Sequence, residues 1–526
     1  METVEMLIIN AEILSMDKDE STYNWMIVKD GKVLDLGVND SYKGKYENIT
    51  EVLDLGGKTL VPGFYDTHVH LVQTGLNYEG VDLRYADSIS SILDLISKAS
   101  KEIPKGDLIR GYHLDVTNIK EKRFPTRKEL DKVAPAHPVW INSFEFHTSS
   151  VNTLALSMTN LPYSLDGIAR DERNLPLGYF TGKASAFIRN KMLNYLTDDM
   201  RMKGVKKAIN QALKKGVTSI NTMEGGYTFH EKDANFIMKN RDLFPIDIKL
   251  FYQTFDLNKI KEYDLNCIGG DIFLDGAFSS RTAAVSTGYK DTKETNQGSL
   301  YFKQSELNYF VKEAHKNRLQ ISLHAIGDIA IEQALKSYEH AQSSFYIEDT
   351  RHRIEHFELA TDDQIQRAAD LGLVIVVQPV FEKKWGNPGG MYETRLGKDI
   401  ALKTNNFRKL VDLGIVLSGS SDSDITEINP LEGIHSAVNH PKPTYSLTPM
   451  EALKMYTINS AYANFEENLK GSLEKNKYAD FVVLCDNPIK IEKDKIENIK
   501  VCATVKQGNI IYMDKNFKLR GEGVEE

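Results

Sequence analysis

The pair His68-Val69-His70 is the first feature of the sequence that could carry chemistry. It ends an apolar run that predicts a β-strand over residues 60–70. Side chains two positions apart on a strand point to the same side, so both imidazoles can reach one metal ion. With 13 histidines in 526 residues, chance alone gives about 0.3 such pairs. Taken alone, the pair is therefore more typical of two structural histidines.

Further polar residues stand at the ends of other predicted strands. His324 ends ISLH, His356 ends RIEH, and Asp422 follows LSGSS. Each could be a hydrogen-bonded structural residue, but the shared placement favours one centre at the carboxyl ends of parallel strands. Imidazole and carboxylate ligands without clustered cysteines are typical of Zn²⁺ or another borderline divalent ion. We expect one or two such ions per chain.

The elements that must position these residues alternate between strands and helices. Helices are predicted over 202–215, 305–317 and 329–342. Several strand segments are uninterrupted apolar runs, as expected when both faces of a parallel sheet are buried. We therefore predict an α/β chain with a (β/α)8 TIM barrel. The alternative, an open doubly wound sheet, lacks a GxGxxG or phosphate loop after any strand. The predicted strands cover residues 60–70, 217–223, 246–253, 271–274, 320–324, 352–356, 374–378 and 415–420.

Both chain ends have β character. Asp30-Gly31 and Gly508-Asn509 are hairpin signals between short apolar runs. We expect one small composite β-sandwich from residues 1–58 and 470–526, the alternative being two unrelated hairpin modules. The barrel then covers 59–469. A segment at about 76–199 interrupts the alternation of strands and helices in the barrel. We expect this insertion to lie over the active-site mouth.

Composition limits the partners and the compartment. The 65 basic and 74 acidic residues give a net charge of −9, without a basic block, which argues against nucleic-acid or anionic-membrane binding. No apolar run approaches about 18 residues, and the N-terminus lacks the basic region of a signal peptide. Cys267, Cys485 and Cys502 are far apart, which predicts no disulfide framework and suits a cytoplasmic protein. The expected partner is a small-molecule substrate. A homodimer is one possible oligomeric state.

An ordered set of motifs extends over essentially the whole chain. It begins with VPGFYDTHVH at residue 61 and continues with FLDGAFSSRTAA, LQISLHAIGD, RHRIEHFEL, VVQP and SGSSDSDI. This set resembles the metal-dependent amidohydrolase superfamily, in the branch that contains N-substituted formamide deformylase. The resemblance implies a barrel with a composite β-sandwich, a catalytic metal and hydrolysis of a carbon–nitrogen bond. It makes His68, His70, His324 and His356 metal ligands, and Asp422 the catalytic acid/base and a further ligand.

One position departs from the resembling family. Its members usually carry a lysine four residues before the Asp-Gly of the fourth strand, and that lysine is carboxylated and bridges two metals. Here the position is Asp271. At about 3.3 Å per residue, Asp271 would lie roughly 13 Å below the strand end. We therefore expect Glu224 to supply any bridging carboxylate, the alternatives being Asp271, a plain loop role for Glu224, or a single-metal site.

The remaining expected roles concern the substrate. In metal-assisted hydrolysis, Asp422 moves the proton. His147, in the insertion, would either stabilise the oxyanion or only support the lid. Arg281 and Arg353 are expected near an anionic substrate group, although structural ion pairs are the commoner role. Trp385 and Tyr392 would line an apolar pocket or cover the barrel.

Two other functions compete with amide hydrolysis. Deamination of a heterocyclic amine uses the same metal chemistry, and the released product would distinguish it. A non-catalytic scaffold with the same fold is the alternative from another class. The complete set of four histidines and Asp422 argues against that scaffold.

Overall fold

The computed structural model describes residues 4–46, 49–116, 118–143, 148–226 and 230–517 of the chain. It separates into two compact units. The first unit combines residues 1–71 with 209–526, and the second covers 72–208. The chain thus leaves the first unit directly after the predicted histidine strand and returns to it at residue 209. The bounds of the second unit, 72–208, lie close to those expected for the insertion, 76–199.

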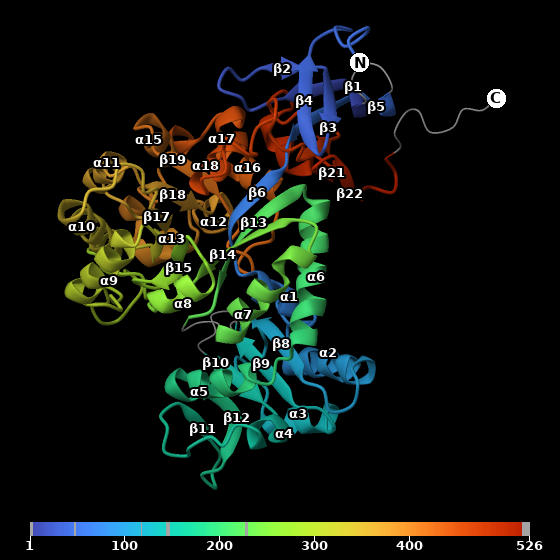
Figure 1. Ribbon diagram of the computed structural model, residues 1–526. Helices are drawn as coiled ribbons and strands as arrows, with labels where there is room; N and C mark the ends of the chain where they lie inside the picture. The colour runs from blue at the N-terminus through green and yellow to red at the C-terminus, as the bar shows by residue number, and fades with distance from the viewer. Residues whose placement is uncertain (1–3, 47–48, 117, 144–147, 227–229, 518–526) are drawn as a thin grey trace. The chain divides into compact units, whose positions relative to one another are not determined.

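Eight parallel strands of the first unit form two sheets (Figure 1). One sheet has the order β14-β13-β6 and the other the order β15-β16-β17-β18-β19, with every pair of neighbours parallel. Most of their residues are buried, which explains the uninterrupted apolar runs in the sequence. The strands are β6 (Phe64–Val69), β13 (Val217–Glu224), β14 (Asp247–Tyr252), β15 (Cys267–Phe273), β16 (Gln320–Ala325), β17 (Arg353–His356), β18 (Val374–Val377) and β19 (Val416–Gly419).

Individual hydrogen bonds link the edges of these two sheets. After β19, the Asp422 amide donates to the His68 carbonyl of β6 at 2.9 Å, and Val69 forms an isolated parallel bridge with Ser423. At the other edges, Gln253 Nε2 donates to the Asp271 carbonyl at 3.0 Å. The strand ends that carry the predicted ligands are therefore held together from both sides.

Helices separate most of these strands. The three helices predicted from the sequence are present as α6 (Asp198–Lys214), α9 (Gln304–Lys316) and α10 (Asp328–Ser344). No helix of the described ranges combines the length and apolar character needed to cross a membrane. The other helices that follow residue 230 are α7 (Glu231–Asn240), α8 (Leu257–Glu262), α11 (Asp362–Asp370), α12 (Pro379–Trp385), α13 (Met391–Leu396), α14 (Lys398–Ala401), α15 (Phe407–Asp412), α16 (Pro430–Val438), α17 (Pro449–Met455) and α18 (Ile458–Ala463).

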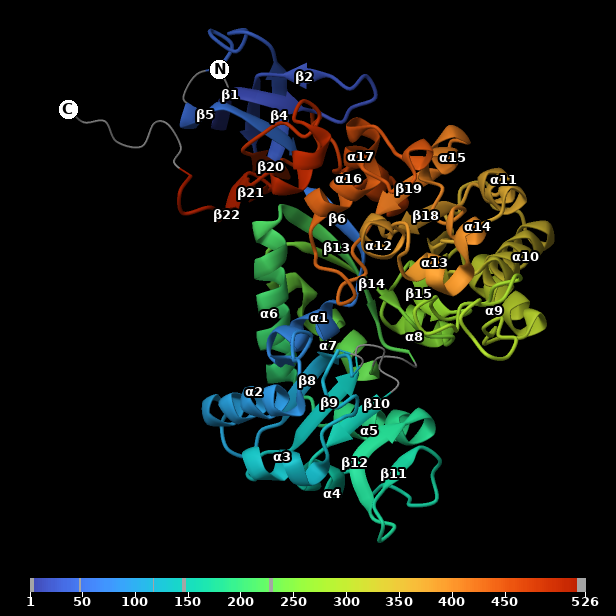
Figure 2. The same ribbon diagram turned by 180° about the vertical axis from the view of Figure 1, so that it is seen from behind.

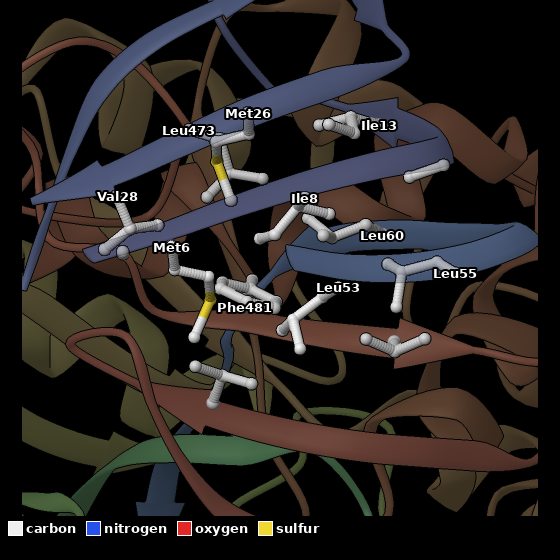
Figure 3. Packing of buried hydrophobic residues seen from close by; sticks show 14 of the residues in the cluster. Met6, Ile8, Ile13, Met26, Val28, Leu53, Leu55, Leu60, Leu473 and Phe481 are labelled. Carbon is white, nitrogen blue, oxygen red and sulfur yellow. The ribbon is translucent and has the colours of Figure 1, made fainter. Parts of the chain in front are cut away.

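Both chain ends contribute to one eight-stranded sheet. Its order is β22-β21-β20-β5-β1-β3-β4, and β2 pairs with β1. Figure 2 shows the C-terminal strands β20 and β21 beside β5 and β1 from the N-terminal end. Ile8, Leu53, Leu60 and Phe481 pack into one buried cluster across the two ends (Figure 3). The alternative of two unrelated hairpin modules is therefore wrong. The strands are β1 (Val4–Leu14), β2 (Thr22–Tyr23), β3 (Trp25–Lys29), β4 (Lys32–Gly37), β5 (Ile49–Pro62), β20 (Phe481–Leu484), β21 (Val501–Lys506) and β22 (Asn509–Met513).

The cysteines correct one expectation. Cys485 and Cys502 form a disulfide with Cα atoms 6.1 Å apart, so the prediction that no cysteines pair is wrong. The two look distant in sequence, but β20 and β21 are antiparallel and place Leu484 opposite Val501. The turn back of the chain therefore brings the thiols together. Cys267 is a free thiol buried in β15.

The second unit has its own sheet and core. The sheet order is β11-β12-β10-β9-β8-β7, and Ile92, Ile96, Leu130 and Ile141 are fully buried against one another. Residues 72–208 therefore form a compact unit with a core of their own. Its strands are β7 (Val81–Asp82), β8 (Ile109–Leu114), β9 (Val139–Ser143), β10 (Thr148–Val151), β11 (Ile168–Arg170) and β12 (Pro176–Thr181), and its helices include α2 (Ile89–Glu102), α3 (Arg127–Val133), α4 (Thr153–Ser157) and α5 (Gly182–Leu193), with α1 (Leu71–Tyr78) at its start.

Strand β15 is irregular in a way that matters for the site. It begins at Cys267, four residues before the predicted start, and its register with β16 shifts between Gly269 and Phe273. Gly269 pairs with Ser322 and Phe273 with His324, so four steps along β15 match only two along β16. Gly269 and Gly270 adopt φ values of 95° and 91°, which favour glycine. This bulge raises Asp271 towards the carboxyl ends of the neighbouring strands.

We predict that Gly269→Ala destabilises the protein more than a matched glycine substitution. A Cβ at residue 269 would lie 2.1 Å from the Ser322 carbonyl oxygen, in addition to the strained positive φ. The expected loss is about 3 kcal/mol in the free energy of unfolding. Gly372→Ala is the control, because Gly372 has φ 62° with open space around it, and its expected loss is about 1 kcal/mol. Equal shifts of the thermal unfolding midpoint in the two variants would contradict the bulge.

Candidate metal centre

Six side chains from the carboxyl ends of the parallel strands meet at one point. His68 and His70 come from the end of β6, and the others come from β15, β16, β17 and the turn after β19. All six are buried, and within them three overlapping groups have ligand atoms within 4.8 Å of one another. The groups are His68, His70 and Asp271; His68, His356 and Asp422; and Asp271, His324 and His356.

Asp271 lies at the middle of this arrangement. Its Oδ2 is 3.4 Å from His70 Nε2. Its Oδ1 is 2.9 Å from His324 Nδ1 and 3.8 Å from His356 Nε2. Oδ2 therefore faces His70, whereas Oδ1 faces His324 and His356 and also lies 4.0 Å from His68 Nε2. The expectation that Asp271 lies too low in the fold is wrong, because the bulge in β15 raises it.

Asp422 reaches the centre from a tight turn. Its Oδ1 is 3.2 Å from His70 Nε2 and 3.4 Å from His68 Nε2. The residue adopts φ 51°, and its amide is bonded to the His68 carbonyl. Buried Asp66 accepts a hydrogen bond from the amide of Ser421 at 3.0 Å. The backbone on both sides of the carboxylate is thus fixed to strand β6, which also carries the two histidines.

Each histidine has its second ring nitrogen engaged away from the centre. His68 Nδ1 is 2.7 Å from Glu355 Oε2, His70 Nδ1 is 3.1 Å from the Met223 carbonyl, and His356 Nδ1 is 2.8 Å from Gln378 Oε1. His324 is reversed. Its Nε2 is 3.2 Å from the Gly276 carbonyl, and its Nδ1 points to Asp271. Donation of one N–H to a carbonyl or carboxylate is typical of metal-binding histidines, because it turns the other nitrogen's lone pair towards the ion.

The electrostatics of the centre fit a bound cation. Burial lowers the pKa of His70, but the carboxylates of Asp422 and Asp271 outweigh burial and raise it to about 10. Burial raises the pKa of Asp271, whereas His324 and His356 hold it well below its usual range. His68 Nε2 is buried and makes no hydrogen bond within the described part of the chain. Two buried carboxylates thus require positive charge here, which protons or a divalent ion can supply.

Arg353 and Glu355 form a buried support beneath His68. The Arg353 guanidinium is fully buried and donates to Glu355 Oε1 at 2.8 Å, to Asn221 Oδ1 at 3.0 Å and to the Thr67 carbonyl at 2.8 Å. Burial raises the pKa of Glu355, but Arg353 and His68 hold it at about 2. Of the two roles considered for Arg353, this placement favours the structural ion pair over substrate binding. The guanidinium instead keeps the carboxylate that orients His68 ionised.

Glu224 does not have the bridging position expected for it. It ends β13, is fully buried, and accepts a hydrogen bond from Thr222 Oγ1 at 2.6 Å. Among the described residues it belongs to none of the three groups of candidate ligands. The geometry of the described residues therefore favours Asp271 over Glu224 as the carboxylate of this centre. The sequence places the start of β15 at Asp271, whereas the strand begins at Cys267.

The other residues considered for substrate binding lie in different environments, one in an ion pair and two among aromatic or buried side chains. Arg281 forms a two-pronged ion pair with Asp291, at 2.9 and 2.7 Å, which favours its structural role. Trp385 packs on Phe381 with ring centroids 4.8 Å apart, and Phe381 stacks parallel to the His356 ring at 6.3 Å. Tyr392 is buried and donates to Glu358 Oε2 at 2.5 Å. His147 lies outside the described residues.

Sequence and structure comparisons identify relatives of this chain. The sequence model of the amidohydrolase family matches residues 51–512. N-substituted formamide deformylase of Arthrobacter pascens is 28% identical over 97% of this chain and 98% of its own. Uncharacterised metal-dependent hydrolases of Pyrococcus furiosus and Pyrococcus horikoshii have similar structures. Each has a TM-score of 0.78 at 27% identity, covering 92% and 93% of this chain and 100% and 99% of theirs. The match over most of its length shows that the chain belongs to the amidohydrolase family.

Proposed function

We propose that this protein is a metal-dependent hydrolase that cleaves a carbon–nitrogen bond in a small amide, formamide or cyclic amide. The observation that carries the proposal is the convergence of four oriented imidazoles and two carboxylates at the strand ends. The similarity to N-substituted formamide deformylase supports amide-type bonds as the substrate class. Imidazole and carboxylate donors favour Zn²⁺ among the common ions.

The ligand residues would be His68, His70, His324 and His356, with Asp271 and Asp422. When bound here, a divalent ion lowers the pKa of a water towards about 7 and polarises the carbonyl that is attacked. The chain's own contribution is to fix these donors. Glu355, the Met223 carbonyl and Gln378 hold three of the four rings, so that little reorganisation is needed when substrate arrives.

Asp422 is the residue proposed to move the proton. Burial raises the pKa of its carboxyl, but His68 and His70 lower it below the usual value, so the group is ionised at neutral pH. An ionised carboxylate can accept a proton from the attacking water and then donate it to the leaving nitrogen. Asp422 is also the carboxylate that follows the last parallel strand directly, level with the histidines of β6.

We further infer that the two parallel sheets close into one (β/α)8 barrel, with the chain-end sheet as part of a β-sandwich. The hydrogen bond from Asp422 to His68 and the Val69–Ser423 bridge support closure at one pair of edges. The bond from Gln253 to the Asp271 carbonyl supports closure at the other. A barrel would bring the ends of β6, β15, β16, β17 and β19 into the ring that their convergence on one site requires.

The substrate class can be tested with the metal-loaded protein. We expect hydrolysis of at least one member of a panel of N-formyl amines, N-acyl amino acids and cyclic amides, measured as released formate, carboxylate or amine. Release of ammonia from heterocyclic amines alone would instead identify a deaminase. Full metal content with no turnover of any compound would favour a scaffold.

We predict that Asp422→Asn folds and still binds metal but loses about 10²-fold or more in turnover, because the amide cannot take the proton. Asp424→Asn is the matched control. It changes a buried aspartate two residues further on that belongs to none of the candidate ligand groups. Its turnover should fall by less than about tenfold. Near-native turnover of Asp422→Asn would exclude the proposed role.

We predict that Glu355→Gln weakens Zn²⁺ binding by about 10–100-fold, because the neutral amide orients His68 less strongly. The measurement is the dissociation constant from competition with a chelator. Glu382→Gln is the control, since Glu382 is an equally buried glutamate that accepts from Lys442 Nζ at 3.0 Å and contacts none of the four histidines in a described hydrogen bond. Unchanged affinity in Glu355→Gln, or the same loss in both variants, would show that Glu355 has no orienting role.

A further inference from the structure

Asp275 is a fully buried aspartate that the proposed mechanism does not use. It lies two residues beyond the end of β15 and belongs to none of the candidate ligand groups among the described residues. Its carboxylate accepts three backbone N–H donors, from Ile326 at 3.0 Å and from Gly327 and Ala284 at 2.8 Å each. Such donors compensate a buried charge for the loss of water. Two of them follow His324, a candidate metal ligand, so Asp275 is anchored to the strand end that carries this ligand.

Three consecutive residues, 274 to 276, each bond to the end of β16. The Leu274 amide donates to the His324 carbonyl at 3.0 Å. The Asp275 carboxylate holds the amides two and three positions beyond that histidine. The Gly276 carbonyl is 3.2 Å from His324 Nε2. Residues 274–276 thus form a clamp on the backbone and the ring of one histidine, and the side chain of Asp275 is its middle link.

The Gly276 carbonyl decides which ring nitrogen of His324 faces the metal centre. A carbonyl oxygen only accepts, so the nitrogen beside it carries the proton, and the other nitrogen, Nδ1, can offer its lone pair to an ion. Asp275 Oδ1 is 3.7 Å from Nε2, which is too far for a hydrogen bond. Its negative charge nevertheless favours a proton on that nitrogen.

The loop that follows the clamp holds Asp275 from the other side. The Ala284 amide donates to Asp275 Oδ2 at 2.8 Å. A Cβ on Gly327 would lie 2.1 Å from the Ala284 carbonyl oxygen, so the close approach of this loop to the start of α10 depends on glycine. Gly276 is confined in the same way, since a Cβ there would lie 1.9 Å from Thr282 Oγ1. The Gly276 carbonyl therefore has little freedom to leave the ring while these contacts are intact.

We propose that Asp275 is a positioning residue of the metal centre, which holds the Gly276 carbonyl against His324 and thereby keeps Nδ1 of that ring directed to the ion. The proposal rests on the proposed function, since it concerns the same centre. Asp275 acts through Gly276 rather than by binding the ion. An uncharged amide cannot replace this carboxylate, because its NH₂ group would face a backbone N–H that also donates.

The first test measures the dissociation constant for Zn²⁺ by competition with a chelator. Asp275→Asn should bind Zn²⁺ about 10–100-fold more weakly than wild type. Asp328→Ala is the control for anchoring of the loop alone. Asp328 Oδ1 accepts from the Ser286 amide at 2.9 Å and so ties the same loop to the start of α10, without a described hydrogen bond to His324 or Gly276.

The control should lose thermal stability but bind Zn²⁺ like wild type. A role of Asp275 in loop anchoring alone would instead affect both variants alike. Wild-type affinity in Asp275→Asn, or an equal loss of affinity in the two variants, would overturn the proposal.

A second measurement uses wild type and does not depend on any variant folding. Linkage is reciprocal, so a clamp that strengthens Zn²⁺ binding must itself be stabilised by Zn²⁺ to the same extent. Exchange of the Ala284, Ile326 and Gly327 amides with deuterated water should therefore slow by up to about 10–100-fold on Zn²⁺ loading. The Ser286 amide, which is bonded to Asp328, should change less. Unchanged exchange of the three amides would contradict the positioning role.

Neither measurement uses turnover. If both give the expected result and no carbon–nitrogen bond is cleaved, the proposed function fails while the positioning role stands. If such a bond is cleaved and Asp275→Asn binds Zn²⁺ like wild type, the positioning role fails while the function stands.

Discussion

The burial of two carboxylates among four imidazoles is the interaction on which the rest of this site depends. Asp271 and Asp422 are taken out of water, and the free-energy cost of burying such charges is high unless positive charge or hydrogen-bond donors surround them. The surrounding side chains supply this positive charge and these hydrogen bonds in successive shells around the two carboxylates. Histidines contact the carboxylates, acceptors such as Glu355 and Gln378 fix the histidines, and Arg353 balances Glu355 from below.

The strand ends supply the geometry for this arrangement. Strand β5 continues into β6 with only Gly63 between them, so one stretch of chain carries both the chain-end sheet and His68 with His70. The Gly63 amide donates to the Asp480 carbonyl at 2.9 Å, and a Cβ at residue 63 would lie 2.3 Å from Thr218 Oγ1. The position of the two histidines is thus fixed by packing well away from the metal centre.

Much of the site could be predicted from sequence because it follows simple periodicity. The spacing of His68 and His70, and the polar residues that follow apolar runs at His324, His356 and Asp422, depend only on strand geometry. The place of Asp271 could not be predicted in this way. Two glycines start a bulge that changes the register, and no apolar pattern records it. The partners of Arg353 could not be predicted either, because Asn221 and Thr67 come from distant strands. The Cys485–Cys502 pair depends on the pairing of β20 with β21, which the spacing of the cysteines alone does not show.

The position of β5 in its sheet has a consequence for how the chain is made. One neighbour of β5, β1, is synthesised before it, but the other, β20, begins only at Phe481. At the usual pace of translation, that second partner emerges from the ribosome roughly 20–80 s later. Throughout this interval a long strand has an open edge, which is the kind of surface on which chains aggregate. The newly made chain therefore depends on protection of the free edge of β5, for example by a chaperone, until synthesis is nearly finished.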